Sequence, residues 1–226
     1  MTHVLDKPAW SALTSRHADL AEGGSLARRY QPSIVPFAAM LDNAPQSLQA
    51  LAALVSAGDS IVMLQADEIA LPVGFTVLSS AAGVQMVADG PHQRVCDERV
   101  QPLTASDAAA MLALATLTKP GPFSLRAREL GDFWGVKVEG RLVAMAGERM
   151  KLPGYTELSG VCTHPDARGR GFGRLLSQVV AGQITARGQV PFLHAYAANA
   201  AAIALYESIG FRVRIGMNVA FARHGA

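Results

Sequence analysis

The part of the sequence best suited to chemistry is a turn in which glycines lie among arginines. It consists of Arg168, Gly169, Arg170, Gly171, Phe172, Gly173 and Arg174. Glycines remove the side chains that would keep an anion away from the backbone. Successive backbone N–H groups at the start of a helix can then point at the anion, and the helix dipole adds a partial positive charge. The turn therefore predicts a site for a phosphate or diphosphate.

Two common nucleotide-binding patterns do not fit this turn. The dinucleotide pattern Gly-x-Gly-x-x-Gly fails, because counting from Gly169 puts Arg174 at its last position. A nucleoside-triphosphate loop would end in Gly-Lys-Ser/Thr, which does not occur here. The turn also lies far from the first strand–helix unit, where a dinucleotide domain carries its glycines. A nucleotide-binding oxidoreductase is disfavoured, and a glycine-rich connection without a ligand stays as the simplest alternative.

Further candidate residues lie on predicted elements around the turn. Asn199 opens a predicted helix, and Tyr206 follows it by two helical turns, so both side chains share one stripe. The amide of Asn199 can bind a ligand or cap the helix. Glu148, Glu157 and His194 lie on predicted strands and are the groups able to exchange a proton.

Hydrophobic spacing predicts the elements that must position these residues. Predicted helices cover 10–21, 46–57, a segment that begins at Thr104 and stops at 119–122, 123–130, 171–187 and 199–209. Predicted strands cover 60–64, 74–78, 134–138, 142–150, 155–163, 190–196 and 211–221. The segment 30–45 contains Pro32, Pro36 and Pro45 and is predicted to be irregular.

This order of elements predicts an α/β fold, a mixed sheet with helices on both faces. The texture of the sequence changes near residue 100, after a polar stretch over 90–102. We therefore predict an N-terminal lobe over 1–100 and a second domain over 101–226.

The second domain resembles the GNAT-type N-acetyltransferases over about residues 103–223. The resemblance rests on Arg168-x-x-Gly171-x-Gly173, on the helix from Asn199 through Tyr206, and on its exit at Gly210-Phe211. It implies the GNAT acyl-CoA N-acyltransferase fold. Residues 1–100 match no motif of this kind, and a degenerate second copy of the same fold is one interpretation of them.

The resemblance implies that acetyl-CoA binds as a co-substrate where two parallel strands separate, here 155–163 and 190–196. Its diphosphate would lie on the glycine turn. The amides of its pantetheine arm can hydrogen-bond to an open strand edge, which predicts backbone contacts from Val161, Cys162 and Thr163. Backbone contacts do not constrain side chains, so Cys162 is expected to be a buried apolar filler.

Acetyl transfer to an amine also needs a base and an acid. The resemblance gives the acid role to Tyr206, whose hydroxyl can protonate the departing thiolate. Glu157 is our first candidate for the general base, because it falls where several family members place a glutamate; Glu148 and His194 stay as alternatives. The competing interpretations are an ion-paired Glu157 and a Tyr206 that is only a core aromatic.

The composition and charge of the sequence argue against several classes of protein. The 226 residues are 50% hydrophobic and 17% charged, which excludes a disordered chain. A net charge of +2 is too balanced for a dedicated nucleic-acid binder. No apolar run is long enough for a membrane span, and Asp6 and Pro8 argue against a signal peptide. Cys96 and Cys162 show no metal-ligand spacing, so we expect no metal. Lone cysteines stay reduced in the cytoplasm, and with the argument against a signal peptide they predict a cytoplasmic location.

We therefore predict an N-acetyltransferase that moves the acetyl group of acetyl-CoA to a primary amine of a small molecule or amino acid by direct attack. The alternative is a non-catalytic module that binds or senses acyl-CoA. The acceptor, the use of longer acyl groups and the oligomeric state stay open, and a homodimer is compatible with the sequence.

Overall fold

The computed structural model describes residues 3–225 of the chain. Its α-helices are α1 (Pro8–Leu13), α2 (Pro45–Leu54), α3 (Ala108–Thr118), α4 (Phe172–Ala186) and α5 (Ala200–Glu207). Its strands are β1 (Ala21–Gly23), β2 (Ala27–Tyr30), β3 (Ala38–Met40), β4 (Ser60–Gln65), β5 (Phe75–Ala88), β6 (Val100–Leu103), β7 (Phe133–Val138), β8 (Arg141–Leu152), β9 (Tyr155–Thr163), β10 (Val190–Tyr196) and β11 (Phe211–His224).

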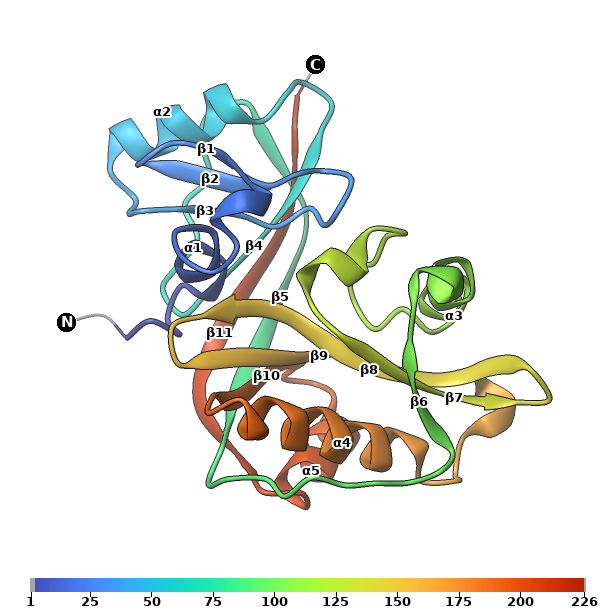
Figure 1. Cartoon of the computed structure of the whole chain (residues 1–226). Helices are drawn as coiled ribbons and strands as arrows, with labels where there is room; N and C mark the ends of the chain where they lie inside the picture. The colour runs from blue at the N-terminus through green and yellow to red at the C-terminus, as the bar shows by residue number, and fades with distance from the viewer. Residues whose placement is uncertain (1–2, 226) are drawn as a thin grey trace.

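Eight of these strands form one mixed sheet in the order β4-β11-β5-β10-β9-β8-β7-β6 (Figure 1). The pair β9 and β10 is parallel, and the other neighbours are antiparallel. Strands β1, β2 and β3 form a separate small sheet in the upper lobe of Figure 1. The predicted α/β class with a mixed sheet is confirmed.

The two halves of the chain share the large sheet. Strand β5 comes from the first half and lies between β10 and β11 of the second half. It pairs with β11 along a long antiparallel ribbon, from Phe75 opposite His224 to Ala88 opposite Phe211. In Figure 1 this ribbon runs from the lower body up into the upper lobe, so residues of both halves meet beside it.

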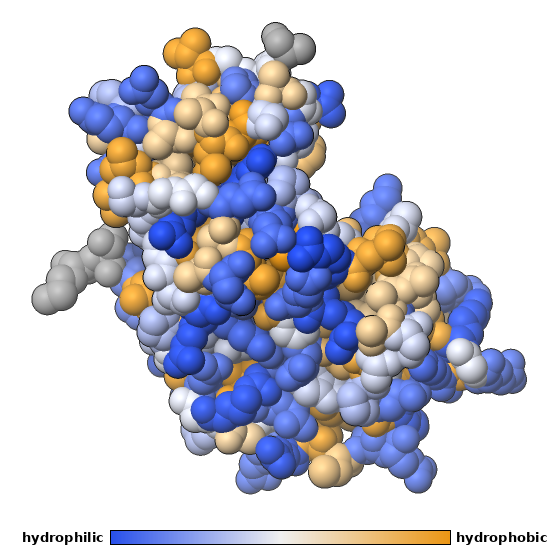
Figure 2. All heavy atoms as spheres, turned by 45° about the horizontal axis from the view of Figure 1, so that its top comes forward, coloured by the Kyte–Doolittle hydropathy of each residue, from blue (hydrophilic) through white to orange (hydrophobic). Residues whose placement is uncertain are grey.

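Helices cover both faces of the sheet, as predicted. Helix α4 buries Leu176, Val180 and Ile184, which recur at every fourth residue, in one core cluster. Helix α3 buries Met111 and Leu114 in a different cluster, together with strand residues of β7 and β8. Polar side chains cover much of the lower body in Figure 2, and apolar ones gather in separate patches, one of them over the upper lobe.

The start of the second half follows its sequence signals. The carboxylate of Asp107 accepts the N–H of Thr104 at 2.8 Å and so closes a capping box before α3. Lys119 ends α3 in the left-handed conformation, with φ 52°. Of the predicted second helix, only the 3₁₀ turn Ala127–Leu130 forms.

Predictions for the first half were less accurate. The helix predicted over 10–21 ends at Leu13, and the next residue, Thr14, turns its hydroxyl back onto the carbonyl of Trp10 at 2.8 Å. The segment predicted to be irregular contains the short strand β3. The strand predicted over 74–78 continues to Ala88.

None of the helices among residues 3–225 combines the length and the apolar character that a bilayer crossing requires.

Candidate functional site

The glycine turn has the geometry of an anion site. Gly169 and Gly171 have φ values of 75° and 77°, a left-handed conformation that glycine adopts at little cost. No N–H group from Gly169 to Arg174 has a hydrogen-bond partner within residues 3–225, and the first bond of α4 runs from the N–H of Leu175 to the carbonyl of Gly171. The turn therefore presents unpaired backbone donors at the positive end of a helix.

The arginines of the turn have different surroundings. Arg168 lines a cavity of about 530 Å³. The guanidinium of Arg170 lies over the ring of Phe172, 4.9 Å from its centroid, and that ring is buried beneath the turn. Arg174 donates to the hydroxyl of Ser208 at 2.7 Å and so ties α4 to the end of α5.

The predicted separation of two parallel strands is confirmed. β9 and β10 begin and end at the predicted residues, and their pairing stops where Phe192 lies opposite Glu157. Beyond that point β10 pairs only with β5. The edge of β9 from Leu158 to Thr163 is therefore open toward β10.

The ladder between β8 and β9 fixes which backbone groups face this opening. The N–H of His164 donates to the carbonyl of Val143 at 2.7 Å, which makes these residues a hydrogen-bonded pair. Hydrogen-bonded pairs alternate along an antiparallel ladder, so Cys162 and Met145 form the next one. The backbone groups of Val161 and Thr163 consequently point away from β8 and into the opening, where the pantetheine arm was predicted.

A cavity of about 530 Å³ extends from this opening to the upper lobe. Six of the predicted binding and catalytic residues line it: Val161, Cys162, Thr163, Arg168, Asn199 and Tyr206. The first half of the chain supplies Phe37, Val62, Leu64 and a stretch of β5 to the same cavity. Cys162 is buried, as predicted, and burial raises the pKa of its thiol to about 11.

Asn199 and Tyr206 both lie on the cavity wall. The side-chain oxygen of Asn199 accepts the N–H of Ala202 at 3.1 Å, so Asn199 caps α5 while its amide nitrogen stays available. Within residues 3–225 the Tyr206 hydroxyl has no hydrogen-bond partner, and it is not among the buried unpaired polar atoms. It therefore has access to the cavity.

Burial raises the pKa of Tyr206 to about 12. Because the folded state holds this proton more tightly than an unfolded chain with a pKa near 10, the phenolate of Tyr206 should form only as the pH approaches 12. The residue's contribution to stability should be complete below about pH 10 and decline between pH 10 and 12. A near-ultraviolet pH titration of the wild type and of Tyr206→Phe should place the difference in phenolate absorbance near pH 12; a difference centred near pH 10 would contradict it.

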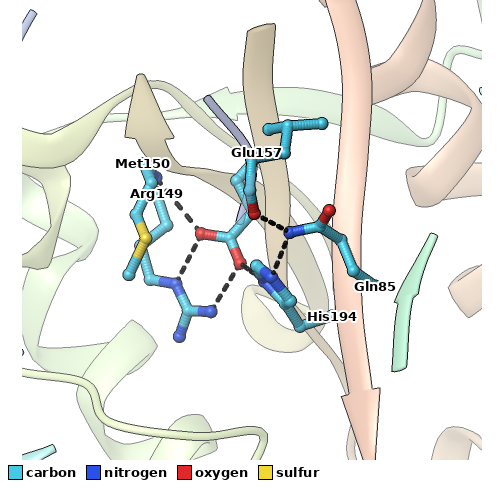
Figure 3. A network of polar contacts seen from close by, with 6 residues as sticks. Gln85, Arg149, Met150, Glu157 and His194 are labelled. Atoms are coloured by element: carbon cyan, nitrogen blue, oxygen red, sulfur yellow. Dashed lines mark hydrogen bonds and ion pairs between the residues drawn. The ribbon is translucent and has the colours of Figure 1, made fainter. Parts of the chain in front are cut away.

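Glu157 lies beneath the cavity wall and does not line the cavity. Its carboxylate has no exposed surface and accepts Arg149 Nε at 2.8 Å and Nη2 at 2.6 Å. It also accepts His194 Nδ1 at 2.7 Å and the N–H of Met150 at 3.3 Å (Figure 3). Burial opposes ionisation, but the charge of Arg149 and the bonds from Arg149 and His194 outweigh it and lower the pKa of Glu157 to about 2. With its lone pairs occupied, this carboxylate fits a positioning role better than the general-base role predicted from the sequence.

The contacts of Glu157 continue through His194 to Gln85 (Figure 3) and, with Arg214, form a polar chain across five neighbouring strands. His194 lies opposite Gln85, and the two side chains are joined at 3.0 Å through His194 Nε2. Arg214 Nε donates to the Gln85 oxygen at 2.5 Å, and the Gln85 nitrogen donates to the carbonyl of Leu5 at 2.8 Å. This fixes the amide with its nitrogen toward His194, so His194 Nε2 accepts and Nδ1 carries the proton. Both ring nitrogens are thus engaged in this structure.

The alternative base Glu148 lies elsewhere. It has no exposed surface, does not line the cavity, and pairs with Arg187 at the end of α4 and with Lys151 Nζ at 2.9 Å. The sequence reasoning singled out Glu148 and Glu157 but gave Arg149 no role of its own. Arg149 does line the cavity. Arg149 belongs to no local motif from which this role could be recognised, because its partner Glu157 lies on the neighbouring strand.

Replacing Gly171 by alanine tests the turn. A Cβ atom would meet nothing within 4 Å, but the left-handed conformation costs alanine about 1–2 kcal/mol. Relief of that strain would turn the neighbouring N–H groups, so acetyl-CoA should bind at least tenfold more weakly, the equivalent of about 1.4 kcal/mol. Titration calorimetry measures this loss.

Gly188, just beyond the other end of α4, provides the matched control. It has φ 72° and equally open surroundings, so Gly188→Ala should show the same strain but bind acetyl-CoA like the wild type. Equal binding by the two variants would exclude the turn as the diphosphate site.

Two segments of the sequence match known proteins. Residues 135–219 match the family model described as FR47-like protein. A 72-residue segment is 42% identical to the ribosomal protein bS18–alanine N-acetyltransferase of Salmonella typhimurium (strain LT2). That segment is 31% of this chain and 48% of the relative, so the chain spans about half the length of the curated relative that it matches.

Two solved structures extend over the whole chain. A structure from Novosphingobium aromaticivorans, assigned to the GNAT family of acetyltransferases, is 40% identical, covers 100% of both chains and has a TM-score of 0.93. A GCN5-related N-acetyltransferase from Kribbella flavida is 16% identical, covers 100% of this chain and 97% of its own, and shares the fold with a TM-score of 0.66. The GNAT-type fold thus includes the N-terminal half, and the chain belongs to the GNAT family of acetyltransferases.

Proposed function

We propose that the chain transfers the acetyl group of acetyl-CoA to the primary amine of a small molecule or amino acid. The observation that carries this proposal is the row of unpaired N–H groups from Gly169 to Arg174 beside the open edge of β9. A diphosphate on the turn and a pantetheine arm along Val161 and Thr163 would direct the thioester into the cavity that Tyr206 lines. Acetyl-CoA is then the co-substrate, and no metal is required.

The proposed reaction is a direct attack. The amine nitrogen forms a bond to the thioester carbonyl carbon, and the carbon–sulfur bond breaks. Tyr206 gives its proton to the departing sulfur, so coenzyme A leaves as a thiol. The attacking nitrogen releases one of its protons to solvent as the amide forms, and the phenol recovers a proton from solvent. The open backbone N–H of Val161 is the donor that we propose for the carbonyl oxygen.

The amine must arrive without its extra proton. Lys119 and Arg168 line the cavity and have no ion-pair partner among residues 3–225, whereas the charge of Arg149 is paired with Glu157; no aspartate or glutamate among these residues lines the cavity. Positive charges nearby disfavour an ammonium ion and favour the neutral amine. We therefore propose that the proton leaves the amine to water, and that Glu157 acts by holding Arg149 and His194 in place.

A peptide N-terminus is a second candidate acceptor. The observation in its favour is the matching segment of the Salmonella relative, whose name describes acetylation of a ribosomal-protein alanine. We propose the cytoplasm as the location, which is consistent with the free thiols of Cys96 and Cys162.

The experiment is a titration with acetyl-CoA followed by a thiol-release assay against small amines, amino acids and short peptides. The proposal predicts binding of acetyl-CoA and release of free coenzyme A that depends on an amine. Binding without release for any amine would favour the acyl-CoA-binding module instead.

A further inference from the structure

Arg149 has one hydrogen-bonding nitrogen that the protein does not use. Nε and Nη2 are held by Glu157, whereas Nη1 has no partner within residues 3–225. Nη1 is not among the buried unpaired polar atoms, and it lies 3.8 Å from where a Cβ on Gly121 would be. Arg149 and Gly121 both line the cavity, and both also line a neighbouring pocket of only about 10 Å³, so this nitrogen lies where the two spaces adjoin. In Figure 3 it points away from Glu157.

Arg149 is held rigidly in this orientation. Its side chain is only 14% exposed, and Glu157 grips it with two parallel bonds. Its guanidinium also lies over the ring of Phe37, 4.7 Å from the centroid. The polar chain through His194, Gln85 and Arg214 in turn holds Glu157. A donor fixed by so many contacts loses little entropy when it binds a ligand.

Arg149 is separated from the glycine turn by most of the length of β9. It pairs with Glu157 on β9, and β9 continues for six residues to Thr163 before the chain reaches the turn. Six residues of strand cover about 20 Å. Arg149 shares the cavity with apolar side chains from both halves of the chain: Phe37, Val62 and Leu64 from the first half, and Val219 and Phe221 from β11.

Three other arginines that could hold an acceptor carboxylate are engaged elsewhere. Arg126 pairs with Glu129, and Arg212 pairs with Asp89. Arg214 is paired with Asp6. None of the three lines the cavity. The same cavity lacks an acidic side chain among residues 3–225, so it has no group that would recognise a second ammonium on the acceptor.

We propose that Arg149 binds a carboxylate of the acceptor, and that the acceptor is a small amine carrying a carboxylate and an apolar group. This inference rests on the proposed function, because it names the acceptor class of the same cavity. Arginine and carboxylate form charge-assisted hydrogen bonds with defined geometry, which would place the amine relative to the thioester. Glu157 is then a positioning residue that acts through Arg149.

The test compares acceptors that share one carbon skeleton and differ in whether it carries a carboxylate. Phenylalanine, phenylalaninamide and phenethylamine are given to the wild type with acetyl-CoA, and kcat/KM and calorimetric affinity for the coenzyme-A-bound protein are measured. Phenylalanine should exceed the other two by about tenfold to a hundredfold in both. Phenethylamine or the amide performing as well as the acid would overturn the inference, and so would a preference for diamines or for peptides without a nearby carboxylate.

Variants of the protein test whether Arg149 causes the preference for a carboxylate. Arg149→Gln combined with Glu157→Gln avoids leaving one buried charge unpaired; it should reduce the preference to less than about twofold while the Kd for acetyl-CoA stays within about twofold. Arg212→Gln, an exposed arginine outside the cavity, should keep the preference. A double variant that retains the preference would overturn the role of Arg149. Should the double variant not fold, the acceptor comparison in the wild type still decides.

The two proposals can fail separately. A wild type that neither binds acetyl-CoA nor acetylates any amine contradicts the proposed function. A wild type that acetylates amines without regard to the carboxylate leaves that function standing and contradicts only the acceptor class.

Discussion

Replacing Tyr206 by phenylalanine is expected to lower kcat by about 10²- to 10⁴-fold, the range typical of a lost general acid. The hydroxyl faces the cavity without a protein partner among residues 3–225, so its removal breaks no structural hydrogen bond there. The ring itself packs against Phe211, 6.2 Å between centroids, and phenylalanine preserves that contact. The fold and the Kd for acetyl-CoA should therefore stay close to those of the wild type, and steady-state kinetics with calorimetry measures both.

Tyr155→Phe provides the control for that result. Tyr155 packs against Phe192 in the core and does not line the cavity. Its replacement should leave kcat within about twofold. An unchanged kcat in Tyr206→Phe would remove Tyr206 from the mechanism, and the absence of any turnover in the wild type would favour the acyl-CoA-binding module.

Replacing Glu157 by alanine should lower the free energy of unfolding by about 3–5 kcal/mol, because the buried Arg149 would lose its counter-ion. Glu157 has no exposed surface and joins Arg149, His194 and the N–H of Met150. Urea unfolding measures the change. Glu129→Ala is the matched control: its pair with Arg126 is 2.6 Å long but about 41% exposed on both sides, so it should cost at most about 1 kcal/mol. Similar costs for the two variants would contradict the burial argument.

The carboxylate of Glu157 should also make the free energy of unfolding depend on pH. Its pKa is lowered to about 2 in the folded protein, whereas an unfolded glutamate has a pKa near 4.3. The folded state therefore binds this proton less readily, and the stabilisation is present above about pH 4.3 and lost as the pH falls toward 2. Unfolding free energies of the wild type should decline across this window more steeply than those of Glu157→Ala; parallel profiles would contradict the assignment.

The second half of the fold could be predicted because its signals are local. β9 and β10 begin and end at the predicted residues, and α4 lies within one residue of its predicted bounds, since apolar spacing and glycines mark these elements. The first half carried weaker signals. β5 passes through Ser79, Ser80 and Gly83, which interrupt the apolar pattern, and its length comes from pairing with β11 far along the chain. No local pattern indicates that pairing.

The residues of the candidate site also divide into those that belong to local motifs and those that only the fold brings together. The glycine turn and the helix from Asn199 to Tyr206 are local motifs, and the structure brings Arg168 of the turn and both ends of that helix to one cavity. The ion pair and hydrogen bonds of Glu157 could not be predicted from the sequence, because its partners Arg149 and His194 come from two other strands. The cavity walls from Phe37 to Leu64 belong to the half without a motif, and only the fold brings them there.

The most direct measurement is a crystal structure of the protein with coenzyme A. We expect diphosphate oxygens within hydrogen-bond distance of backbone N–H groups between Gly169 and Arg174, and pantetheine amides paired with Val161 and Thr163. Coenzyme A bound at another surface, with these N–H groups facing only solvent, would contradict the account.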